Sequence, residues 1–398
     1  MLGGLGGAWD DGLLLLAVVV LAWCVLVQRR WRLWTVPITV PFLLAIAAAA
    51  GSVVVRHVPG DVGIFALRLL VQPVLFYFIG FLFPKERRWV AAAVGVFLTS
   101  SSVLSLHGLY QYVTRAPMPA KWVDVAEAGL GTRAYSIVKN PNGLGAFLLL
   151  GTLVSLSLTL APLSRRLRLL AAGVCVLHLA GLAVTFSRGA WLGLGVGLLA
   201  LFILAYRRYL PALASAAFVG WFLLPQKLVD RLQFAFSSTY LARSLVWGRL
   251  YVWQLALQRI AEHPLFGVGL GTFGGTSAAT FAYGRIWVDN FYLQLAAEGG
   301  LLLLVFFLWI LLRGAKGLVK AHASTPDPLL RALAAGVFGG FLAVCFANLT
   351  ASVWETLVVG VGFWFLAGLI TGAVLCESSP ESGEGQAVLT PARGQAAR

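Results

Sequence analysis

Long hydrophobic runs separated by polar segments make up most of the chain, and they predict an all-α fold with about 11 (10–12) transmembrane helices. Most runs reach the roughly 20 residues that a helix needs to cross the hydrocarbon core of a bilayer. A transmembrane β-barrel would show short segments of alternating hydrophobicity, whereas these runs are long and unbroken. The predicted transmembrane helices lie at Gly12–Val27, Thr35–Val55, Val62–Phe83, Trp89–Tyr110, Gly143–Leu163, Leu169–Phe186, Ala190–Tyr206, Leu210–Leu224, Phe291–Leu312, Leu330–Ala347 and Val353–Leu375.

Basic residues gather after every second hydrophobic run, which indicates how the chain is oriented in the membrane. Short cytoplasmic loops carry an excess of Lys and Arg, so we expect all of these clusters on the cytoplasmic side. The N-terminus and two long polar segments, residues 111–142 and 225–290, then lie outside, and the C-terminus lies inside. The clusters consist of Arg29, Arg30 and Arg32; Lys85, Arg87 and Arg88; Arg165, Arg166 and Arg168; Arg207 and Arg208; and Arg313, Lys316 and Lys320.

The composition excludes a soluble globular protein, because 60% of the residues are hydrophobic, 11% are charged and the mean hydropathy is +0.87. Basic cytoplasmic loops account first for the net charge of +15, so we expect no nucleic-acid partner. The four cysteines and five histidines show neither disulfide nor metal-ligand spacing, so we expect no cofactor and no metal. We predict one membrane domain, residues 1–375 with both long polar segments included, and a disordered cytoplasmic tail, residues 376–398.

The longest polar segment before the tail, Leu224–Phe291, is about 65 residues long, and loops of this length are usually functional. Within it, Leu245–Glu262 has the spacing of an amphipathic helix that ends before Pro264 and lies on the membrane surface. An inert surface helix is the alternative. The predicted apolar face consists of Leu250, Trp253, Leu257 and Ile260, and the basic residues of the segment are Lys227, Arg231, Arg243, Arg249, Arg259 and Arg285.

Arg188 lies in a tight break between two hydrophobic runs, on the side where short loops carry few basic residues. A guanidinium group binds phosphate oxygens in a bidentate manner, so this arginine is a candidate anion site at the membrane edge. The alternative is an interfacial arginine whose charged end reaches toward water.

Asp289 lies at the start of a hydrophobic run and is a candidate general base or, alternatively, a helix N-cap. Asn290 could serve as the cap instead. Arg68 and Glu298 fall within predicted transmembrane helices, where ionisable residues are functional candidates. The alternative for these two residues is a structural pair.

Several motifs together resemble those of the O-antigen ligase/polymerase superfamily, in the order and with the topology of its members. They cover most of the chain and do not separate ligases from polymerases. The motifs are Tyr135–Asn142 (YSIVKNPN), Thr185–Trp191 (TFSRGAW), Arg249–Trp253 (RLYVW), Ile260–Phe273 (IAEHPLFGVGLGTF), Asp289–Leu293 (DNFYL), and Glu298 with Gly299.

The resemblance implies a metal-independent, GT-C-like glycosyltransferase in the plasma (inner) membrane, with its active site on the extracytoplasmic face. The donor would be an undecaprenyl-diphosphate-linked glycan and the acceptor a glycan or lipid-linked molecule. Arg188 and Arg249 would bind the donor diphosphate. Asp289 stands where many members have the His proposed as the base, so it is the candidate base here. The secondary candidates are Arg133, Arg68, Asn290, Glu298 and Arg285.

We therefore predict an inverting, O-antigen ligase-like glycosyltransferase whose partners also include membrane lipids, and whose long external loop is mobile and covers the donor site like a lid. The first alternative is a polysaccharide polymerase. The second is a lipid or glycan transporter or flippase, in which Arg68 and Glu298 would line the pathway. Transporters often have inverted repeats and paired broken helices, and the sequence shows neither clearly.

Overall fold

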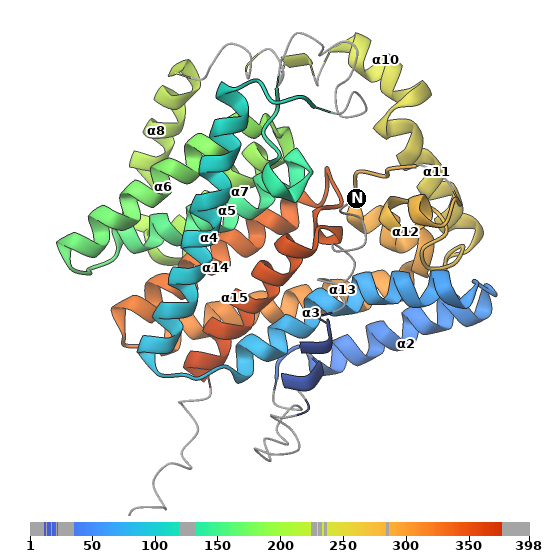
Figure 1. The fold of residues 1–398 in the computed structure, drawn as a ribbon, viewed down its shortest axis with the longest axis horizontal. Coiled ribbons are helices and arrows are strands. Elements are labelled where there is room, and N and C mark those ends of the chain that lie inside the picture. Colours follow the sequence, from blue (N-terminus) through green and yellow to red (C-terminus); the bar gives the residue numbers. More distant parts are fainter. Residues whose placement is uncertain are drawn as a thin grey trace, which may run out of the picture.

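The computed structural model of the chain describes residues 36–118, 132–223, 237–283 and 286–375, with short pieces within residues 12–22 and 229–234. The regular elements in these segments are all helices (Figure 1). They are α2 (Thr39–Val55), α3 (Gly60–Leu82), α4 (Arg87–Val113), η4 (Ser136–Val138), α5 (Pro141–Leu160), α6 (Arg165–Thr185), α7 (Arg188–Ala205), η5 (Arg207–Tyr209), α8 (Leu210–Leu223), α10 (Ser238–Trp247), α11 (Arg249–Glu262), α12 (Gly275–Thr280), α13 (Phe291–Ser324), α14 (Pro328–Ala347), η6 (Val353–Glu355) and α15 (Leu357–Leu375).

Eight of the described helices are long and apolar enough to cross a membrane, namely α3, α4, α5, α6, α7, α13, α14 and α15. The protein is therefore a polytopic, multi-pass membrane protein. Helix α2 is apolar but has 17 residues, and α8 has 14, so neither reaches the length of the other eight. The predicted first helix lies largely outside the described residues, as does the predicted tail. The total of eleven therefore remains a prediction.

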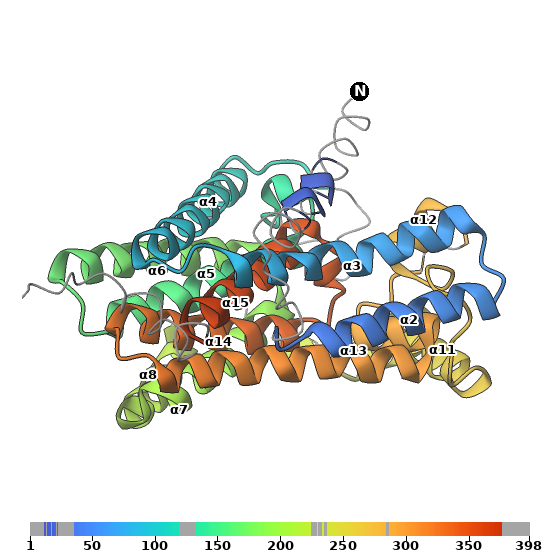
Figure 2. The ribbon, with the colours of Figure 1, turned by 90° about the horizontal axis from the view of Figure 1, so that it is seen from below.

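Several of the long helices run along the long axis of the molecule, and α11 and α12 lie at one end of it (Figure 2). Helices α5, α14 and α15 are mostly buried. Close helix packing in membranes relies on small residues. A Cβ atom at Gly80 of α3 would collide with the backbone of Phe365 in α15, and one at Gly368 would collide with the backbone of Tyr77. These two glycines therefore allow α3 and α15 to pack backbone to backbone.

Helix α13 is broken at Gly300, where φ is +81° and ψ is 173°. The carbonyl oxygens of Ala297 and Glu298 accept hydrogen bonds from the N–H groups of Val268 and Gly269, at 2.9 and 3.0 Å. Irregular backbone at membrane depth is tolerated only where protein or water satisfies its polar groups. The break therefore provides the surface onto which the glycine-rich segment after α11 is built.

The same helix extends twelve residues past the predicted end at Leu312. Its last turns keep one buried face, with Gly314, Gly317 and Leu318 against the core, while Lys316 and Lys320 are exposed. The hydrophobic run alone underestimated the helix because this part has an apolar face on only one side.

The predicted amphipathic helix Leu245–Glu262 is in fact two helices, α10 and α11, separated at Gly248. The Ser244 hydroxyl oxygen accepts a hydrogen bond from the Leu250 N–H at 3.1 Å, which fixes the break. Within the predicted apolar face, Leu257 is 54% exposed, and Leu250, Trp253 and Ile260 are partly buried. The residues of α11 that pack inward are Val252, Trp253, Leu255, Ala256 and Ile260.

Candidate functional site: an arginine pocket

Three arginines from distant parts of the chain line one polar pocket. Arg133 precedes α5, Arg188 is the first residue of α7, and Arg249 is the first residue of α11. We call this site the arginine pocket. Its other lining residues are Asn142, Phe186, Gly189 and Thr350.

Arg133 is buried, and its guanidinium group is held from two sides. Its Nε donates to the carbonyl oxygen of Thr185 at 3.0 Å, and its Nη2 donates to Oδ1 of Asn142 at 3.2 Å. The same Oδ1 accepts the Ser187 hydroxyl at 2.9 Å. Asn140 caps α5 by accepting the N–H of Asn142. The beginning of α5 therefore joins Arg133 to the junction between α6 and α7.

Arg188 is positioned by a sharp reversal of the chain. Phe186 ends α6 with a left-handed φ of +50°, and α7 begins two residues later. A Cβ atom at Gly189 would collide with Thr350, so the segment between α14 and α15 packs directly against this junction. The guanidinium carbon of Arg188 lies 5.2 Å from the ring centre of Tyr240 in α10, a cation–π contact. The long loop therefore reaches over this arginine.

Arg249 forms an ion pair with Asp289, with 2.9 Å between Nε and Oδ2. Both side chains are about one third exposed, at 30% and 33%. Asn290 caps α13, because its Oδ1 accepts the N–H of Leu293 at 3.1 Å, so the capping role belongs to Asn290 and not to Asp289. Asp289 has a left-handed φ of +51° and is instead the partner of Arg249.

Among the described secondary candidates, Arg68, Asn290 and Glu298 do not line the arginine pocket. Arg68 donates to Gln72 within α3, at 3.1 Å. Glu298 is buried, and its carboxylate has a structural role in holding the glycine-rich segment. It accepts the N–H groups of Gly271, Phe273 and Gly274 at 2.9–3.3 Å. Arg285 lies outside the described residues.

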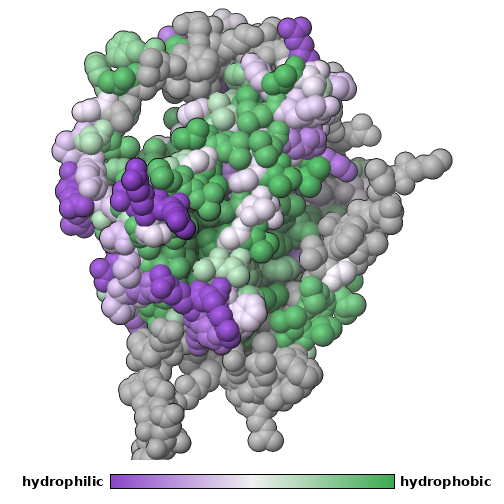
Figure 3. Space-filling model, turned by 60° about the vertical axis from the view of Figure 1, so that its left-hand side comes forward, coloured by the Kyte–Doolittle hydropathy of each residue, from purple (hydrophilic) through white to green (hydrophobic). Residues whose placement is uncertain are grey.

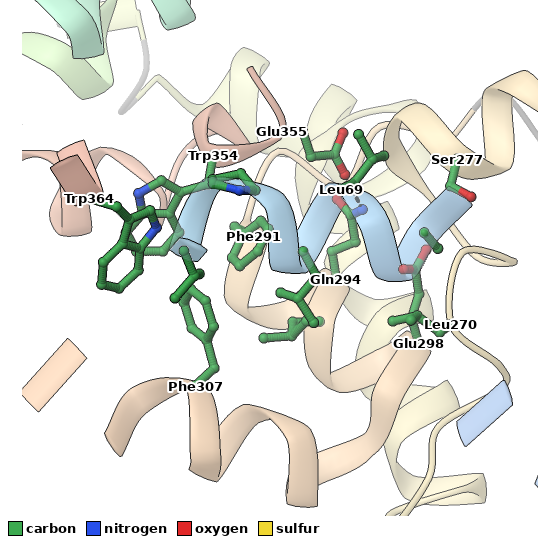
Figure 4. A pocket seen from close by; sticks show the side chains of 15 residues that line it. Leu69, Leu270, Ser277, Phe291, Gln294, Glu298, Phe307, Trp354, Glu355 and Trp364 are labelled. Carbon is green, nitrogen blue, oxygen red and sulfur yellow. Dashed lines mark hydrogen bonds between the residues drawn. The ribbon is translucent and has the colours of Figure 1, made fainter. Parts of the chain in front are cut away.

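A second cavity, lined by residues of α3, α13, η6 and α15, shares no residue with the arginine pocket. Figure 4 shows its aromatic residues at one end and Ser277 and Glu298 at the other. Glu355 accepts both the N–H and the hydroxyl of Thr276, at 2.9 and 2.7 Å, and burial raises its pKa. Four aromatic side chains line this cavity, namely Phe291, Phe307, Trp354 and Trp364.

The sequence did not single out Glu355, Thr350 or Tyr240, and it included Asn142 only as the last residue of the motif Tyr135–Asn142. Glu355 lies in a stretch that was predicted as the start of the last transmembrane helix, although α15 begins only at Leu357. The sequence signal that could have identified Glu355 was a carboxylate within the first residues of a hydrophobic run, Val353–Leu375. For Asn142, the signal was its place directly before a hydrophobic run, in the motif with Asn140.

The arginine pocket is suited to bind a polyanion. Three arginines line one pocket, and Asp289 offsets one positive charge. Guanidinium groups bind phosphate oxygens in pairs and stabilise negative charge that develops on them. Thr185 and Asn142 already hold the Arg133 guanidinium in place, whereas Arg249 must release Asp289 when an anion binds.

Residues 173–308 match the family model described as O-Antigen ligase. This stretch contains Arg188, Arg249 and Asp289, while Arg133 lies before it. The chain therefore carries an O-antigen ligase domain, which belongs to a glycosyltransferase-type enzyme family. The match confirms the resemblance for the motifs that lie within residues 173–308. No curated protein matches the chain.

Proposed function

We propose that this membrane protein with an O-antigen ligase domain transfers a glycan from an undecaprenyl-diphosphate-linked donor to an acceptor at the outer face of the plasma membrane. The observation that carries this proposal is the convergence of Arg133, Arg188 and Arg249 on one pocket. A diphosphate leaves with two or three negative charges, so its departure needs fixed positive charge more than a general acid. The arginines supply that charge without a metal.

Asp289 is the proposed base. Its carboxylate accepts the proton of the acceptor hydroxyl while that oxygen forms a bond to the anomeric carbon of the donor sugar. The bond from this carbon to the diphosphate oxygen breaks, and its electron pair leaves with the diphosphate. Attack from the opposite face inverts the configuration of the anomeric carbon.

The ion pair between Arg249 and Asp289 supports a link between donor binding and base activity. A bound diphosphate competes with the Asp289 carboxylate for the Arg249 guanidinium. Binding of the donor then frees the carboxylate to accept a proton. The pair holds both residues near the site until the donor arrives.

The contacts of Arg68 and Glu298 favour the enzyme over a transporter or flippase. A transport pathway would need these two residues to face a passage through the membrane. Glu298 instead binds three backbone N–H groups of the glycine-rich segment, and Arg68 contacts Gln72 on its own helix. A polysaccharide polymerase remains the second candidate function, because it differs from a ligase only in the acceptor.

The decisive experiment is transfer by the purified protein in liposomes, with a synthetic undecaprenyl-diphosphate oligosaccharide as donor. We expect elongated or newly glycosylated acceptor together with free undecaprenyl diphosphate. Release of neither product would contradict the proposal. The glycans of a deletion strain then identify the acceptor class, because a ligase defect accumulates lipid-linked polymer and a polymerase defect accumulates single repeat units.

A further inference from the structure

A second basic cavity, of about 570 Å³, lies between the α2–α3 turn and the end of α11. Four basic side chains line it: Arg56 and His57 from the turn, and Arg259 and His263 from α11 and its C-cap. It shares no residue with the arginine pocket. Arg249 and Arg259 are ten residues apart in α11, so the two sites lie about 15 Å apart along this helix.

The two sides of the cavity are fixed relative to each other. His57, two residues after the end of α2, has a left-handed φ of +50°, and its N–H donates to the Val54 carbonyl at 3.2 Å. The Ser52 hydroxyl lies within 2.8 Å of the Phe266 carbonyl oxygen and 2.9 Å of that of Glu298. These contacts fasten the end of α2 to the segment after α11, so the cavity is organised before any ligand binds.

The charge of the cavity favours an anion. Nε of Arg56 is buried and has no hydrogen-bond partner within the described part of the chain. A buried donor without a partner is costly unless a ligand or water accepts from it. Arg259 donates from Nη1 to Glu262 at 3.0 Å, so this carboxylate offsets one charge. The two guanidinium groups still leave the cavity positive when both imidazoles are neutral.

The other residues that line the cavity indicate which kind of molecule bears the negative charge of the ligand. Tyr283, which is 46% exposed, lines the cavity together with the largely buried Phe273, and Thr272 adds a hydroxyl. The volume is well above what a lone phosphate fills. Aromatic faces pack against the apolar C–H faces of sugar rings, and guanidinium forks fit phosphate or carboxylate oxygens.

We propose that this cavity binds an acidic sugar of a glycan substrate, that is, a sugar that bears a phosphate or a carboxylate. The proposal rests on the proposed function, since it assigns part of a glycan substrate to a place about 15 Å from the donor diphosphate. Such a contact selects glycans that carry negative charge at a defined distance from the reacting bond.

The test measures binding alone. The full-length protein in nanodiscs of phosphatidylcholine is titrated calorimetrically with glucose 6-phosphate, with glucose and inorganic phosphate as comparison ligands. We expect Arg56→Gln with Arg259→Gln to weaken glucose 6-phosphate binding at least tenfold. The matched control, Arg207→Gln with Arg208→Gln, removes the same charge from η5, and we expect its binding to stay within twofold of the unaltered protein.

Arg188→Ala separates this proposal from the proposed function. If the unaltered protein does not transfer glycan, the proposed function is wrong, but the measured binding of glucose 6-phosphate is not affected by that result. We expect Arg188→Ala to bind glucose 6-phosphate as the unaltered protein does. A loss of binding in that variant places the ligand in the arginine pocket and overturns the second site.

Three further outcomes overturn the proposal. The first is unchanged binding of glucose 6-phosphate by the Arg56 and Arg259 double variant, and the second is binding of inorganic phosphate as tight as that of glucose 6-phosphate. The third is loss of glucose 6-phosphate binding when phosphatidylglycerol is included in the nanodisc. The last outcome would identify a lipid headgroup as the ligand. If the double variant does not fold, Arg259→Lys keeps the charge and loses the planar fork. We expect this variant to bind at least threefold more weakly, and equal binding counts against the proposal.

Discussion

At the scale of single residues, the three arginines of the pocket differ in what holds them. Arg133 is bound by a backbone carbonyl and an amide, Arg188 lies over an aromatic ring, and Arg249 is paired with a carboxylate. Arg249 must exchange a charged partner, Asp289, when an anion binds.

Arg188→Ala is expected to reduce glycan transfer by a factor on the order of 100 or more, because it removes charge from the leaving diphosphate. Arg188→Lys should recover only part of the activity, since it keeps the charge without the bidentate fork. Transfer is measured with purified lipid-linked donor. Arg208→Ala is the control, because Arg208 stacks on Tyr209 outside the pocket. Near-normal transfer by Arg188→Ala would leave Arg188 as an interfacial anchor.

Asp289→Asn should lower transfer by a factor on the order of 100 or more while donor binding persists, because an amide cannot accept the acceptor's proton. The helix start should survive, since Asn290 provides the cap. Asp289→His should restore part of the activity. Donor affinity is measured in parallel, because a mere partner of Arg249 would alter affinity and not the rate. An active Asp289→Asn enzyme would rule out the base.

The sequence predicted the arginine candidates but not their geometry. Arg188 and Arg249 were predicted from motifs to share a ligand, and Arg133 was only a secondary candidate. Their convergence depends on the Arg133–Thr185 and Arg188–Tyr240 contacts, each of which joins residues 52 positions apart in the chain. The pairing of Arg249 with Asp289, 40 residues away, has no local signal in the sequence for the same reason.

At the scale of elements, α10 and α11 differ in how they are held. Trp253 of α11 donates from its indole nitrogen to the Val288 carbonyl at 2.9 Å, and Ala256 is fully buried. Helix α10 contacts Arg188 through Tyr240, yet Trp247 at its end is 90% exposed. From these contacts we expect α11 to act as a fixed support and α10 to move.

Donor binding is therefore expected to slow hydrogen exchange in α10 and to leave α11 and α5 nearly unchanged. A non-transferable diphosphate analogue is added to the purified protein, and exchange is followed by mass spectrometry. Tyr240→Phe should keep the effect because the ring remains over Arg188, and Tyr240→Leu should weaken it. Equal protection of α10 with and without the analogue would mean that this helix is a fixed scaffold.

Gly300→Ala is expected to destabilise the protein by about 1–3 kcal/mol, because only glycine adopts this backbone conformation readily. An added Cβ would also collide with the backbone of Leu265. Thermal unfolding in detergent gives the measurement. Gly195→Ala in α7 is the matched control, since a Cβ there meets open space. An unchanged unfolding temperature for Gly300→Ala would show that the break is not required.

Hydrophobic runs predicted the existence of the long helices but not the breaks at Gly248 and Gly300. Both breaks depend on neighbours: Ser244 takes the Leu250 N–H in the first case, and the segment after α11 takes the carbonyls of α13 in the second. The extension of α13 to Ser324 was missed because its buried face contains glycine and alanine as well as leucine.

At the scale of the whole molecule, the surface agrees with a protein surrounded by lipid. Figure 3 shows a broad hydrophobic surface with hydrophilic residues gathered in groups. Large apolar side chains on α3, α4, α6 and α7 are exposed, such as Ile64, Val96, Val176 and Leu192. Since every helix in a bilayer is apolar outside, hydropathy identifies the helices but cannot predict which of them are neighbours. That is why the eight spans were predictable and the arrangement around the arginine pocket was not.

The orientation of the protein is the prediction on which the mechanism depends, because the donor glycan is expected on the outer face. The basic clusters place α10 outside and the end of α13 inside. Single cysteines are introduced at Ser238 in α10 and, as the control, at exposed Ser324 at the end of α13. Spheroplasts are then treated with a membrane-impermeant maleimide, with the unaltered chain as background for its own cysteines.

Ser238→Cys should react in intact spheroplasts, and Ser324→Cys only after the membrane is permeabilised. A third cysteine at Ser379, in the predicted tail, should behave like Ser324→Cys. Ser238 lies in α10 two residues before Tyr240, whose ring contacts Arg188. The label at Ser238 therefore also reports the side of the membrane on which the arginine pocket lies. If Ser238→Cys reacts only after permeabilisation, the pocket faces the cytoplasm, and transfer from a donor on the outer face is impossible.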